Sequence, residues 1–264
     1  MTIKNKTNSR GGKMKITASI VTYNNSKEIV NVLSSISKTI IDMGNVYVVD
    51  NNSIDNTVDI VEKEFPRVNI IKSKLNLGYG KSHNEAIKIV ESDYHIIINP
   101  DIILEPNSIS NMVEYMENNA NTVILTPKVL NVDGTEQFLP KRLPRYKYLL
   151  GGRLPFKFAK KWRREYTMQD DKIENPIKID FCTGCFMFCR TKALKAVNGF
   201  DDRYFMYFED ADLTREMQKI GDTVYVPSIE VTHVWKRESK KNKKLLKIHI
   251  QSMKKYFKKW RKNK

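Results

Sequence analysis

The sequence predicts an α/β protein with a mostly parallel central sheet flanked by helices. Apolar segments rich in β-branched residues alternate with helical patterns along the first half of the chain, and polar residues follow the ends of these segments. Helices that connect parallel strands make right-handed crossovers. Since ligands of such sheets bind beyond the carboxyl ends of the strands, we expect the functional site there.

The composition fits a folded cytoplasmic protein. With 264 residues, of which 41% are hydrophobic, the chain can bury a sizeable core. It has no apolar run near the roughly 18 residues of a membrane-spanning helix, and its first residues lack the apolar centre of a signal peptide. We expect residues 1–13 to be a disordered lead-in and the three cysteines to be reduced thiols.

The net charge of +16 is concentrated at the carboxyl end. Residues 236–264 contain fourteen Lys and Arg and one acid, whereas the rest of the chain is nearly balanced. A protein that binds nucleic acid through its body would carry basic charge there, so we expect no nucleic-acid partner. The distribution instead predicts attachment of the tail to an anionic surface.

Four apolar segments are predicted strands, and helical spacing of apolar residues follows three of them. The strands are 15–24, 46–49, 68–71 and 94–98, and helical residues follow near positions 29, 58 and 84. The first two strands end at Tyr23-Asn24 and Asp50-Asn51-Asn52. Asp50 is also an ordinary turn former, but its place at a strand end favours a binding role.

Two glycines, Gly78 and Gly80, precede the third of these helices. Their spacing lacks the third glycine of a dinucleotide-binding loop, and they do not follow the first strand, which excludes that interpretation. Glycine here allows a tight turn or a close approach of the backbone to a ligand.

The strongly apolar strand 94–98 ends at Asn99-Pro100-Asp101. A carboxylate just beyond a buried strand is well placed to hold a divalent cation, because Mg²⁺ is usually held by one or two carboxylates and substrate phosphates. Asn-Pro-Asp is also good turn chemistry. The position at the strand end favours the cation.

Residues 131–177 interrupt the alternation. A hairpin-like turn at residues 131–134 precedes a basic and aromatic segment, from Phe138 to Glu165. We expect this segment to be mobile and to clamp phosphate or face an anionic surface. A solvated loop is the alternative.

A buried strand is predicted over residues 179–189, and it contains all three cysteines at the spacing CxxCxxxC. An iron–sulfur site is disfavoured because a fourth ligand is missing and the flanking residues favour a strand. Free cysteine is common in protein cores.

Five carboxylates crowd between Asp201 and Asp212, around an aromatic run, and a helical pattern follows. Acids favour the first turn of a helix, where the backbone dipole stabilises each by about 0.3–1 kcal/mol, but this explains only one or two of them. A polar site with an aromatic wall, in which one carboxylate is a base, explains more. Asp201 and Asp202 are expected to be turn residues that face solvent.

Two further strands are predicted over residues 224–227 and 231–235. His233 is expected to follow a strand that returns toward the sheet edge carrying Asp101, and neutral imidazole is a common metal ligand. A lone histidine is more often structural, but this position favours a metal site.

From Lys243 onward, apolar residues recur at alternating spacings of four and three, and lysines fill most of the other face. The apolar residues are Leu246, Ile250, Met253, Phe257 and Trp260. This pattern predicts a basic amphipathic helix that lies in a membrane interface or packs on the protein's own body. Both can hold if docking leaves the lysines outward.

Taken together, these segments resemble the inverting family 2 glycosyltransferases of the GT-A fold, and most of all the rhamnosyltransferases that build bacterial surface polysaccharides. The resemblance runs from about Lys15 to Trp235. It is carried by the ordered motifs SIVTYNN (19–25), VVDNNSIDNT (48–57), NLGYGKSHNEAI (76–87), INPDI (98–102), TGCFMFCRTKAL (183–194), NGFDDRYFMYFEDADLTREMQKIG (198–221) and THVW (232–235).

The resemblance implies that different parts of one Rossmann-like domain have different functions. Residues 14–130 form the half that binds the nucleotide sugar. Residues 131–235 form the acceptor-binding and catalytic half, and residues 236–264 form the basic C-terminal helix.

The resemblance also implies roles for donor and metal residues. Donor contacts are expected from Thr22, Tyr23, Asn24, Asp50, Asn52, Gly78 and Asn99. Asp101 takes the last position of the family's DxD-type motif for Mg²⁺ or Mn²⁺, and His233 completes the metal site. Asn99 stands where many members have an aspartate, which leaves one negative charge fewer for the metal.

The implied reaction is a single in-line displacement with Asp210 as base. It moves a sugar, with L-rhamnose as a candidate, from a dTDP- or UDP-sugar to a lipid-linked oligosaccharide. Acceptor contacts are expected from Glu209, Asp212, Trp235 and Tyr207. The alternatives are a family member with a different hexose donor and a non-catalytic glycan- or nucleotide-binding protein. The chain is expected at the inner face of the cell membrane, and an oligomer is compatible with the sequence.

Overall fold

The computed structural model of the chain describes residues 14–151, 156–234 and 243–261. The strands are β1 (Ile16–Thr22), β2 (Val46–Asp50), β3 (Asn69–Lys72), β4 (Tyr94–Ile98), β5 (Ile102–Leu104), β6 (Thr122–Leu130), β7 (Ile177–Lys178), β8 (Phe186–Arg190) and β9 (Asp222–His233). The helices are α1 (Ile29–Ile36), α2 (Thr57–Glu64), α3 (Tyr79–Ile89), α4 (Ser108–Asn118), α5 (Tyr146–Gly151), α6 (Lys157–Tyr166), α7 (Thr191–Ala196), α8 (Glu209–Met217) and α9 (Lys243–Arg261), with a short 3-10 helix η1 (Met43–Asn45). The predicted disordered lead-in, residues 1–13, lies outside the described residues.

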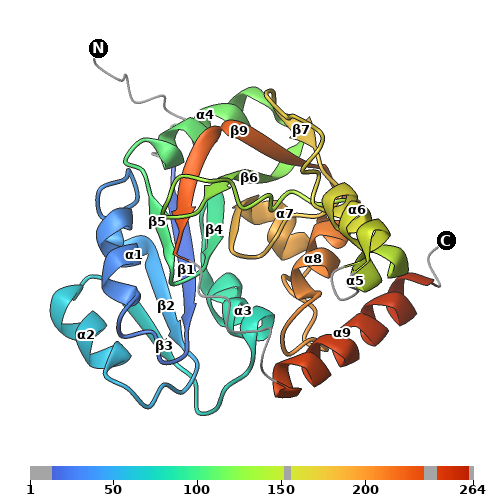
Figure 1. Ribbon diagram of the computed structural model, residues 1–264. Coiled ribbons are helices and arrows are strands. Elements are labelled where there is room, and N and C mark those ends of the chain that lie inside the picture. The colour runs from blue at the N-terminus through green and yellow to red at the C-terminus, as the bar shows by residue number, and fades with distance from the viewer. Residues whose placement is uncertain (1–13, 152–155, 235–242, 262–264) are drawn as a thin grey trace.

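Within the described residues, all nine strands belong to one sheet (Figure 1). Its order is β3-β2-β1-β4-β8-β6-β9-β5, with β7 paired to β9. Strands β3, β2, β1 and β4 are parallel, as predicted, and β6 is parallel to β9. Antiparallel pairing of β8, β5 and β7 makes the whole sheet mixed. The parallel half brings the carboxyl ends of β1, β2 and β4 to one edge.

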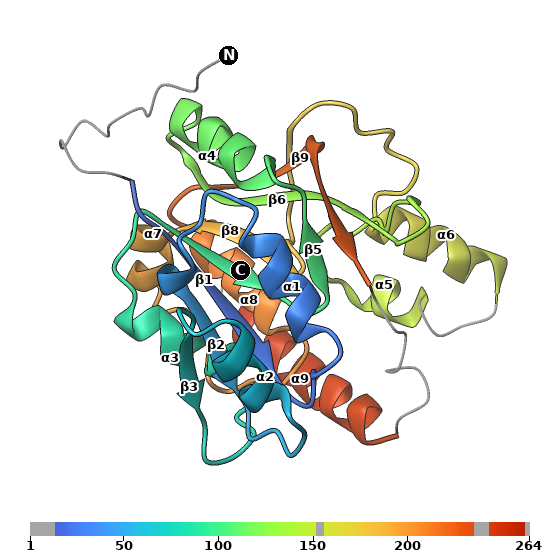
Figure 2. The same ribbon diagram turned by 90° about the vertical axis from the view of Figure 1, so that its left-hand side faces the viewer.

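Alternate residues of the parallel strands are buried on opposite faces of the sheet. Ile20 and Ile96 pack in one core with residues of α1, α2 and α4. Ile97 packs in a second core with residues of α3, α7 and α8. Because successive side chains of a strand point to opposite faces, a continuously buried strand such as β4 requires helices on both sides. Figure 2 shows α1 and α2 on the near face of the sheet.

One strand, β9, replaces the two strands predicted for its sequence. Its pairing with β6 shifts in register between Pro127 and Lys128, which leaves residues 227–229 as a bulge. A bulge bends the strand that contains it. The first part of β9 therefore pairs with β7, and its last residues pair with β5, where His233 lies opposite Ile102.

The strand predicted over residues 179–189 is confirmed only for residues 186–189, which belong to the buried strand β8. β7 ends at Lys178 and β8 begins at Phe186, and a turn at Gly184-Cys185 lies between them. The part before β8 packs against α8, where the Cys182 amide donates to the Thr214 hydroxyl oxygen at 3.3 Å. The three cysteines are buried free thiols, as predicted.

The segment from Phe138 to Glu165, which the sequence predicted to be mobile, contains α5 and α6. The rings of Tyr148 and Tyr166 stack across these helices with centroids 5.1 Å apart. Tyr146 stacks on Phe257 of α9 at 4.1 Å. These three tyrosines, which alternate with basic residues in the sequence, therefore contribute to helix packing. The basic composition of the segment gave no sign of this packing.

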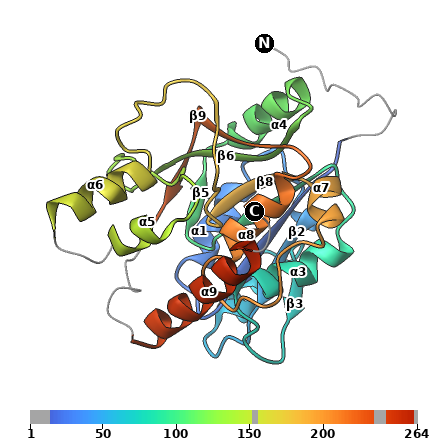
Figure 3. The same ribbon diagram turned by 90° about the vertical axis from the view of Figure 1, so that its right-hand side faces the viewer.

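The C-terminal helix α9 packs on the body of the protein. Its buried residues are Ser252, Tyr256 and Trp260, whereas Leu246 of the predicted apolar stripe is 44% exposed. The carboxyl-terminal part of the predicted stripe packs on the body, since Trp260 is buried and Met253 and Phe257 are partly buried against the same cluster. The packed face also includes Ser252 and Tyr256, and most of the lysines of the helix stay exposed. Figure 3 shows α9 beside α8.

Candidate active site

The first group of candidate residues lies where β1 and β2 end side by side. Thr22 and Asp50 are neighbours in the parallel ladder, and the Thr22 hydroxyl donates to Asp50 Oδ1 at 3.3 Å. Both side chains are buried, and Asp50 Oδ2 accepts from the Ser53 amide at 3.1 Å. These bonds hold the Asp50 carboxylate in one orientation at the strand end.

Tyr23, Asn24 and Asn52 are exposed at the same edge. Tyr23 is 51% exposed, and the two asparagines have φ angles of +58° and +66°. Asparagine adopts this left-handed region more readily than most residues. The Asn24 amide donates to Ser53 Oγ at 2.9 Å, and its side-chain oxygen accepts from the Ile54 amide at 2.9 Å. The loops after β1 and β2 thus hold each other in place.

Asn51 is a site residue that the sequence did not single out. Its buried side-chain oxygen accepts from the Leu77 amide at 2.8 Å and from the Ser82 hydroxyl at 2.9 Å. Its amino group donates to the Gly78 carbonyl at 3.0 Å. The available signal was a run of polar residues after a strand, which does not say which of them turns inward.

Gly78 occupies a position that only glycine fits. Its φ is +87°, and a Cβ there would lie 2.0 Å from the carbonyl oxygen of Phe205. The Tyr79 amide donates to that same oxygen at 2.9 Å. The close approach expected of this glycine is therefore to the protein's own backbone. It ties the glycine loop to residues 204–210, which precede and include Asp210 and are called the base turn below.

Asp101 and His233 lie together, as the sequence analysis expected. The His233 Nε2 atom is 3.1 Å from Asp101 Oδ1, and the Val234 amide donates to the Asp101 carbonyl at 2.9 Å. Gln137 holds the histidine from the other side. Its side-chain oxygen lies 2.9 Å from His233 Nδ1, and its amino group donates to the His233 carbonyl at 3.0 Å. Because the Gln137 oxygen can only accept, Nδ1 carries the proton.

This arrangement fits a divalent cation. Asp101 Oδ1 is buried and accepts no hydrogen bond from the described residues, and it lies beside the His233 ring. A histidine that binds a metal usually donates its other ring N–H to such a partner. The described residues contain no group of three His, Cys, Asp or Glu for a closed metal site. Two protein ligands suffice where diphosphate oxygens and water complete the coordination of Mg²⁺.

Asp210 lies in the first turn of α8, as predicted. Its Oδ2 accepts from the Gly184 amide at 3.0 Å, and its Oδ1 accepts from the Ala211 amide at 2.9 Å. A Cβ at position 184 would lie 3.2 Å from Asp210 Cβ and 3.2 Å from Tyr79 Cε1. Glycine at 184 therefore leaves room for the carboxylate to receive the backbone amide.

Burial raises the pKa of both Glu209 and Asp210, but their charged neighbours differ. Burial raises the pKa of Asp210, and the Lys141 ammonium and the Gly184 and Ala211 amides partly oppose it. Burial and the charge of Asp210 raise the pKa of Glu209 well above its usual value. Glu209 is 5% exposed, and its Oε2 accepts no hydrogen bond from the described residues. Of the two carboxyl groups, Asp210 ionises first, which makes it the better candidate for a base.

Lys141 belongs to the basic segment but was not among the predicted site residues. Its backbone pairs with Phe181 in an isolated bridge, and its ammonium lies 4.9 Å from the centroid of the Phe181 ring. Its charge acts on Asp210 and on Cys185, and burial lowers its own pKa. Many neighbouring residues are also basic, so the sequence offered no signal that this one turns inward.

The two halves of the candidate site meet at the turn of Gly184 and Cys185. The Asn99 amide donates to the Cys185 carbonyl at 2.9 Å, which places the segment before Asp101 against this turn. The Gly184 amide contacts Asp210 from the same turn. The Tyr79 hydroxyl donates to the Gly184 carbonyl at 2.5 Å. A site that joins the Asp101–His233 pair to Asp210 is therefore built around residues 184 and 185.

Two predicted acceptor residues, Asp212 and Tyr207, are placed differently from Glu209. The Asp212 carboxylate is buried against α9, where it accepts from Lys259 and Trp260. Tyr207 is partly buried and its ring centroid lies 5.2 Å from that of His249. Trp235 lies outside the described residues.

Asp201, which was expected to face solvent, forms ion pairs instead. It contacts Arg203 at 2.8 Å and Lys259 at 3.0 Å, and its side chain is 19% exposed. Asp202 is exposed, as expected, and accepts from the Asn84 amide group at 3.0 Å. The acids of this stretch therefore serve different contacts, and only some of them lie near Asp210.

The fold is that of the GT-A glycosyltransferases. It resembles the structure of Staphylococcus aureus TarS 1-349 in complex with UDP, with a TM-score of 0.60 and 19% identity over 83% of this chain and 60% of that one. It also resembles GalNAc-T7 with UDP, GalNAc and Mn²⁺, with a TM-score of 0.66 and 14% identity over 91% of this chain and 48% of that one.

Residues 17–197 match the model of Glycosyl transferase family 2, and the chain belongs to this family. It is 30% identical over 230 residues to the N-acetylglucosaminyl-diphospho-decaprenol L-rhamnosyltransferase of Mycobacterium tuberculosis, across 81% of this chain and 74% of that protein. It is 26% identical over 164 residues to rhamnosyltransferase WbbL of Escherichia coli K12, across 59% of this chain and 60% of that protein. These findings confirm the resemblance to rhamnosyltransferases.

None of the helices in the described part of the chain is both long enough and apolar enough to cross a membrane.

Proposed function

We propose that this family 2 glycosyltransferase moves L-rhamnose from a nucleoside-diphosphate sugar to a hydroxyl of a lipid-linked or growing cell-surface glycan, with inversion. The observation that carries the proposal is the meeting of Asp210 and the Asp101–His233 pair around one turn at the end of β4. One side can receive a proton and the other can hold a diphosphate.

In this proposal the nucleotide lies over the ends of β1 and β2. Its base and ribose contact the residues exposed or fixed at that edge, which are Thr22, Tyr23, Asn24, Asp50 and Asn52. Gly78 and Asn99 line the path toward the diphosphate. The exposure of the Tyr23 ring beside the fixed Asp50 carboxylate supports this placement, since a planar base can stack on an aromatic ring while a carboxylate accepts from ribose hydroxyls.

Asp101 and His233 would hold Mg²⁺ or Mn²⁺ together with the donor diphosphate. When bound, such a cation neutralises the charge that develops on the departing diphosphate. Asn99 at the first position of the motif supplies a neutral ligand instead of a carboxylate. The mannosyltransferase PcManGT of Pyrobaculum calidifontis, which has the same fold, was solved with GDP-Man and Mn²⁺.

Asp210 is the base in the transfer step. Its carboxylate accepts the proton of the acceptor hydroxyl while that oxygen attacks the anomeric carbon from the face opposite the diphosphate. The bond from the anomeric carbon to the diphosphate oxygen breaks in the same step, which inverts the configuration. The raised pKa of Asp210 makes it a stronger base than an exposed aspartate, and the amide bonds from Gly184 and Ala211 fix its direction.

The acceptor approaches from the side of the base turn. Glu209, with a raised pKa and an oxygen that the described residues leave without a hydrogen bond, orients the acceptor sugar. Tyr207 and Trp235 are proposed to contact sugar faces, and Asp212 supports this side through the base turn. The exposed lysines of α9 attach the protein to the anionic inner face of the membrane that carries the lipid-linked acceptor.

A second candidate is transfer of a different hexose from a UDP-sugar. TarS 1-349, which shares the fold, was solved in complex with UDP-GlcNAc. Thermal stabilisation by a panel of dTDP-, UDP- and GDP-sugars, with and without Mn²⁺, separates these candidates, because a ligand stabilises the folded state that binds it. Stabilisation by dTDP-L-rhamnose above the others supports the first.

The decisive experiment replaces the base. Asp210→Asn keeps the size of the side chain but removes its basicity, so transfer should fall by roughly 10²–10⁴-fold while donor binding stays near wild type. Asp133→Asn, in an exposed turn, is the matched control and should transfer normally. Normal transfer by Asp210→Asn would overturn the base assignment, and donor binding without transfer by the wild type would favour a non-catalytic binding protein.

A further inference from the structure

The base turn that leads to Asp210 is strained. Tyr207 and Phe208 have φ angles of +69° and +68°, so two consecutive aromatic residues lie in the left-handed region directly before Glu209. Residues with a Cβ avoid this region, and such a conformation persists only where the surroundings impose it. The groups that impose it are therefore functionally important, because the direction of the Asp210 carboxylate depends on them.

Several of the contacts that hold this turn come from α9. The Ser252 hydroxyl donates to the Met206 carbonyl at 2.8 Å. The His249 ring centroid lies 5.2 Å from that of Tyr207 and 5.3 Å from that of Phe208. Nearer the start of the turn, the Lys255 ammonium donates to the Arg203 carbonyl at 2.5 Å. Three residues of α9, spaced three apart, thus contact the base turn and the residue just before it.

The strongest attachment is to Asp212, two residues after the base. Its side chain is 1% exposed, and it accepts from Lys259 at 2.6 Å, from Trp260 Nε1 at 2.7 Å and from the Tyr204 hydroxyl at 3.2 Å. A carboxylate this deeply buried requires such partners, because burying it without them is costly. The bonds fix the first turn of α8 to both α9 and the beginning of the base turn.

We propose that α9 is a positioning element of the active site, with Lys259 and Trp260 as positioning residues that act on Asp210 through Asp212. The inference rests on the proposed role of Asp210 as the base. Removal of either contact lets the strained turn relax, so the Asp210 carboxylate loses its direction toward the acceptor hydroxyl. The donor site lies at the ends of β1 and β2, and we expect it to keep its affinity.

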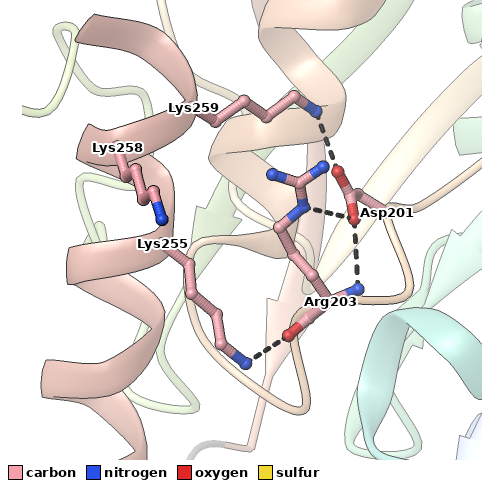
Figure 4. A pocket seen from close by; sticks show the side chains of 5 residues that line it. All are labelled: Asp201, Arg203, Lys255, Lys258 and Lys259. Carbon is pink, nitrogen blue, oxygen red and sulfur yellow. Dashed lines mark hydrogen bonds and ion pairs between the residues drawn. The ribbon is translucent and has the colours of Figure 1, made fainter.

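A neighbouring lysine provides a matched control. A cavity of about 550 Å³ opens between α9 and the chain before the base turn, and it is lined by Asp201, Arg203, Lys255, Lys258 and Lys259 (Figure 4). The Lys259 ammonium forms ion pairs with three carboxylates, those of Asp201, Asp212 and Glu216. Lys258 lines the same cavity and is exposed, and it makes no ion pair with the described residues. The two lysines differ in their contacts and not in their charge.

The test compares four variants of the full chain in steady-state transfer with a nucleotide sugar and a soluble acceptor analogue. We expect Lys259→Met and Trp260→Phe to lower kcat at least about tenfold and to change the KM for the donor less than about twofold. Lys259→Arg keeps a charged donor and should recover part of kcat. Lys258→Met should match the wild type in both constants, because this assay contains no membrane to which its charge could bind. Kinetics are measured at a temperature at which each variant is folded.

Hydrogen exchange of the backbone amides of residues 204–210 gives a readout that needs no turnover. Faster exchange in Lys259→Met and Trp260→Phe than in Lys258→Met supports the inference. Wild-type kcat in both positioning variants, or unchanged exchange in the base turn, would overturn it. If the wild type transfers no sugar, the proposed function fails, and the exchange rates still decide whether α9 holds the turn.

Discussion

At the scale of single residues, the proposed chemistry depends on how the neighbours of Asp210 change the pKa of its carboxyl group. Two opposing effects act on the pKa of Asp210: burial raises it, whereas Lys141 and two backbone amides lower it. Glu209 has no such cation, and its pKa is raised both by burial and by Asp210. The pair therefore holds its first negative charge on Asp210, which is the carboxylate directed at the Gly184 amide.

Lys141 is expected to control the pH at which the base becomes active. In the proposed mechanism transfer requires ionised Asp210, so the rate should rise with pH through the pKa of this group. Lys141→Met removes a cation that favours the ionised form, so the pKa of Asp210 rises further and the acidic limb of kcat/KM moves to higher pH. The measurement is the pH profile of kcat/KM for the variant and the wild type.

The control for this prediction is Lys160→Met, which removes a lysine of the same segment that is exposed on α6. Its pH profile should coincide with that of the wild type. A Lys141→Met profile that also coincides with the wild type would show that the ammonium does not act on the base. A shift toward lower pH would contradict the sign of the interaction.

At the scale of elements, the sequence predicted the structure correctly where a pattern of residues is compatible with only one arrangement. The first strands alternate with helices, and their predicted parallel order was confirmed because right-handed crossovers leave few other arrangements. The juxtaposition of Asp101 and His233 also followed from strand ends. The roles of Asp50, Asp101, His233 and Asp210 in donor, metal and proton chemistry stay predictions.

The sequence was misleading where burial has a cause other than strand pairing. Of residues 179–189, which were predicted as one strand, only residues 186–189 form a strand, β8. The residues before β8 pack against α8, and the Gly184 amide in the turn between them donates to Asp210. The inward-facing residues Asn51 and Lys141 were hidden among similar neighbours. In α9, the face that packs on the protein includes Ser252, which a hydrophobic pattern cannot mark, and its hydroxyl is used for the Met206 carbonyl.

The buried face of α9 can be tested by two truncations of single side chains. Tyr256 is fully buried, so Tyr256→Ala should lower the free energy of unfolding by about 3–5 kcal/mol, as for other large core aromatics. Leu246 is 44% exposed, and Leu246→Ala should change it by less than about 0.5 kcal/mol. Urea unfolding followed by far-UV circular dichroism measures both. A larger loss for Leu246 would mean that the amino-terminal end of the predicted stripe is packed as well.

At the scale of the whole molecule, docking and membrane attachment by α9 are compatible. The helix uses Ser252, Tyr256 and Trp260 to pack on the body. Exposed basic residues remain on its other sides, and they are Lys243, Lys244, Lys247, Lys254, Lys255, Lys258 and Arg261. The helix that holds the base turn therefore also carries charge that an anionic surface attracts, which would bring the active site toward a lipid-linked acceptor.

The charge on α9 should dominate binding to anionic membranes. The triple variant Lys247→Gln, Lys254→Gln and Lys258→Gln removes three exposed charges that make no ion pair with the described residues. Each contributes about 1 kcal/mol near an anionic leaflet, so the sum of about 3 kcal/mol corresponds to roughly a hundredfold weaker binding. Co-sedimentation with vesicles of phosphatidylglycerol and phosphatidylcholine measures the change.

A control that removes the same charge elsewhere, Lys38→Gln, Lys63→Gln and Lys74→Gln, should bind as the wild type does. Equal losses for the two triple variants would mean that net charge alone attracts the protein, and unchanged binding of the α9 variant would leave packing on the body as the role of this helix.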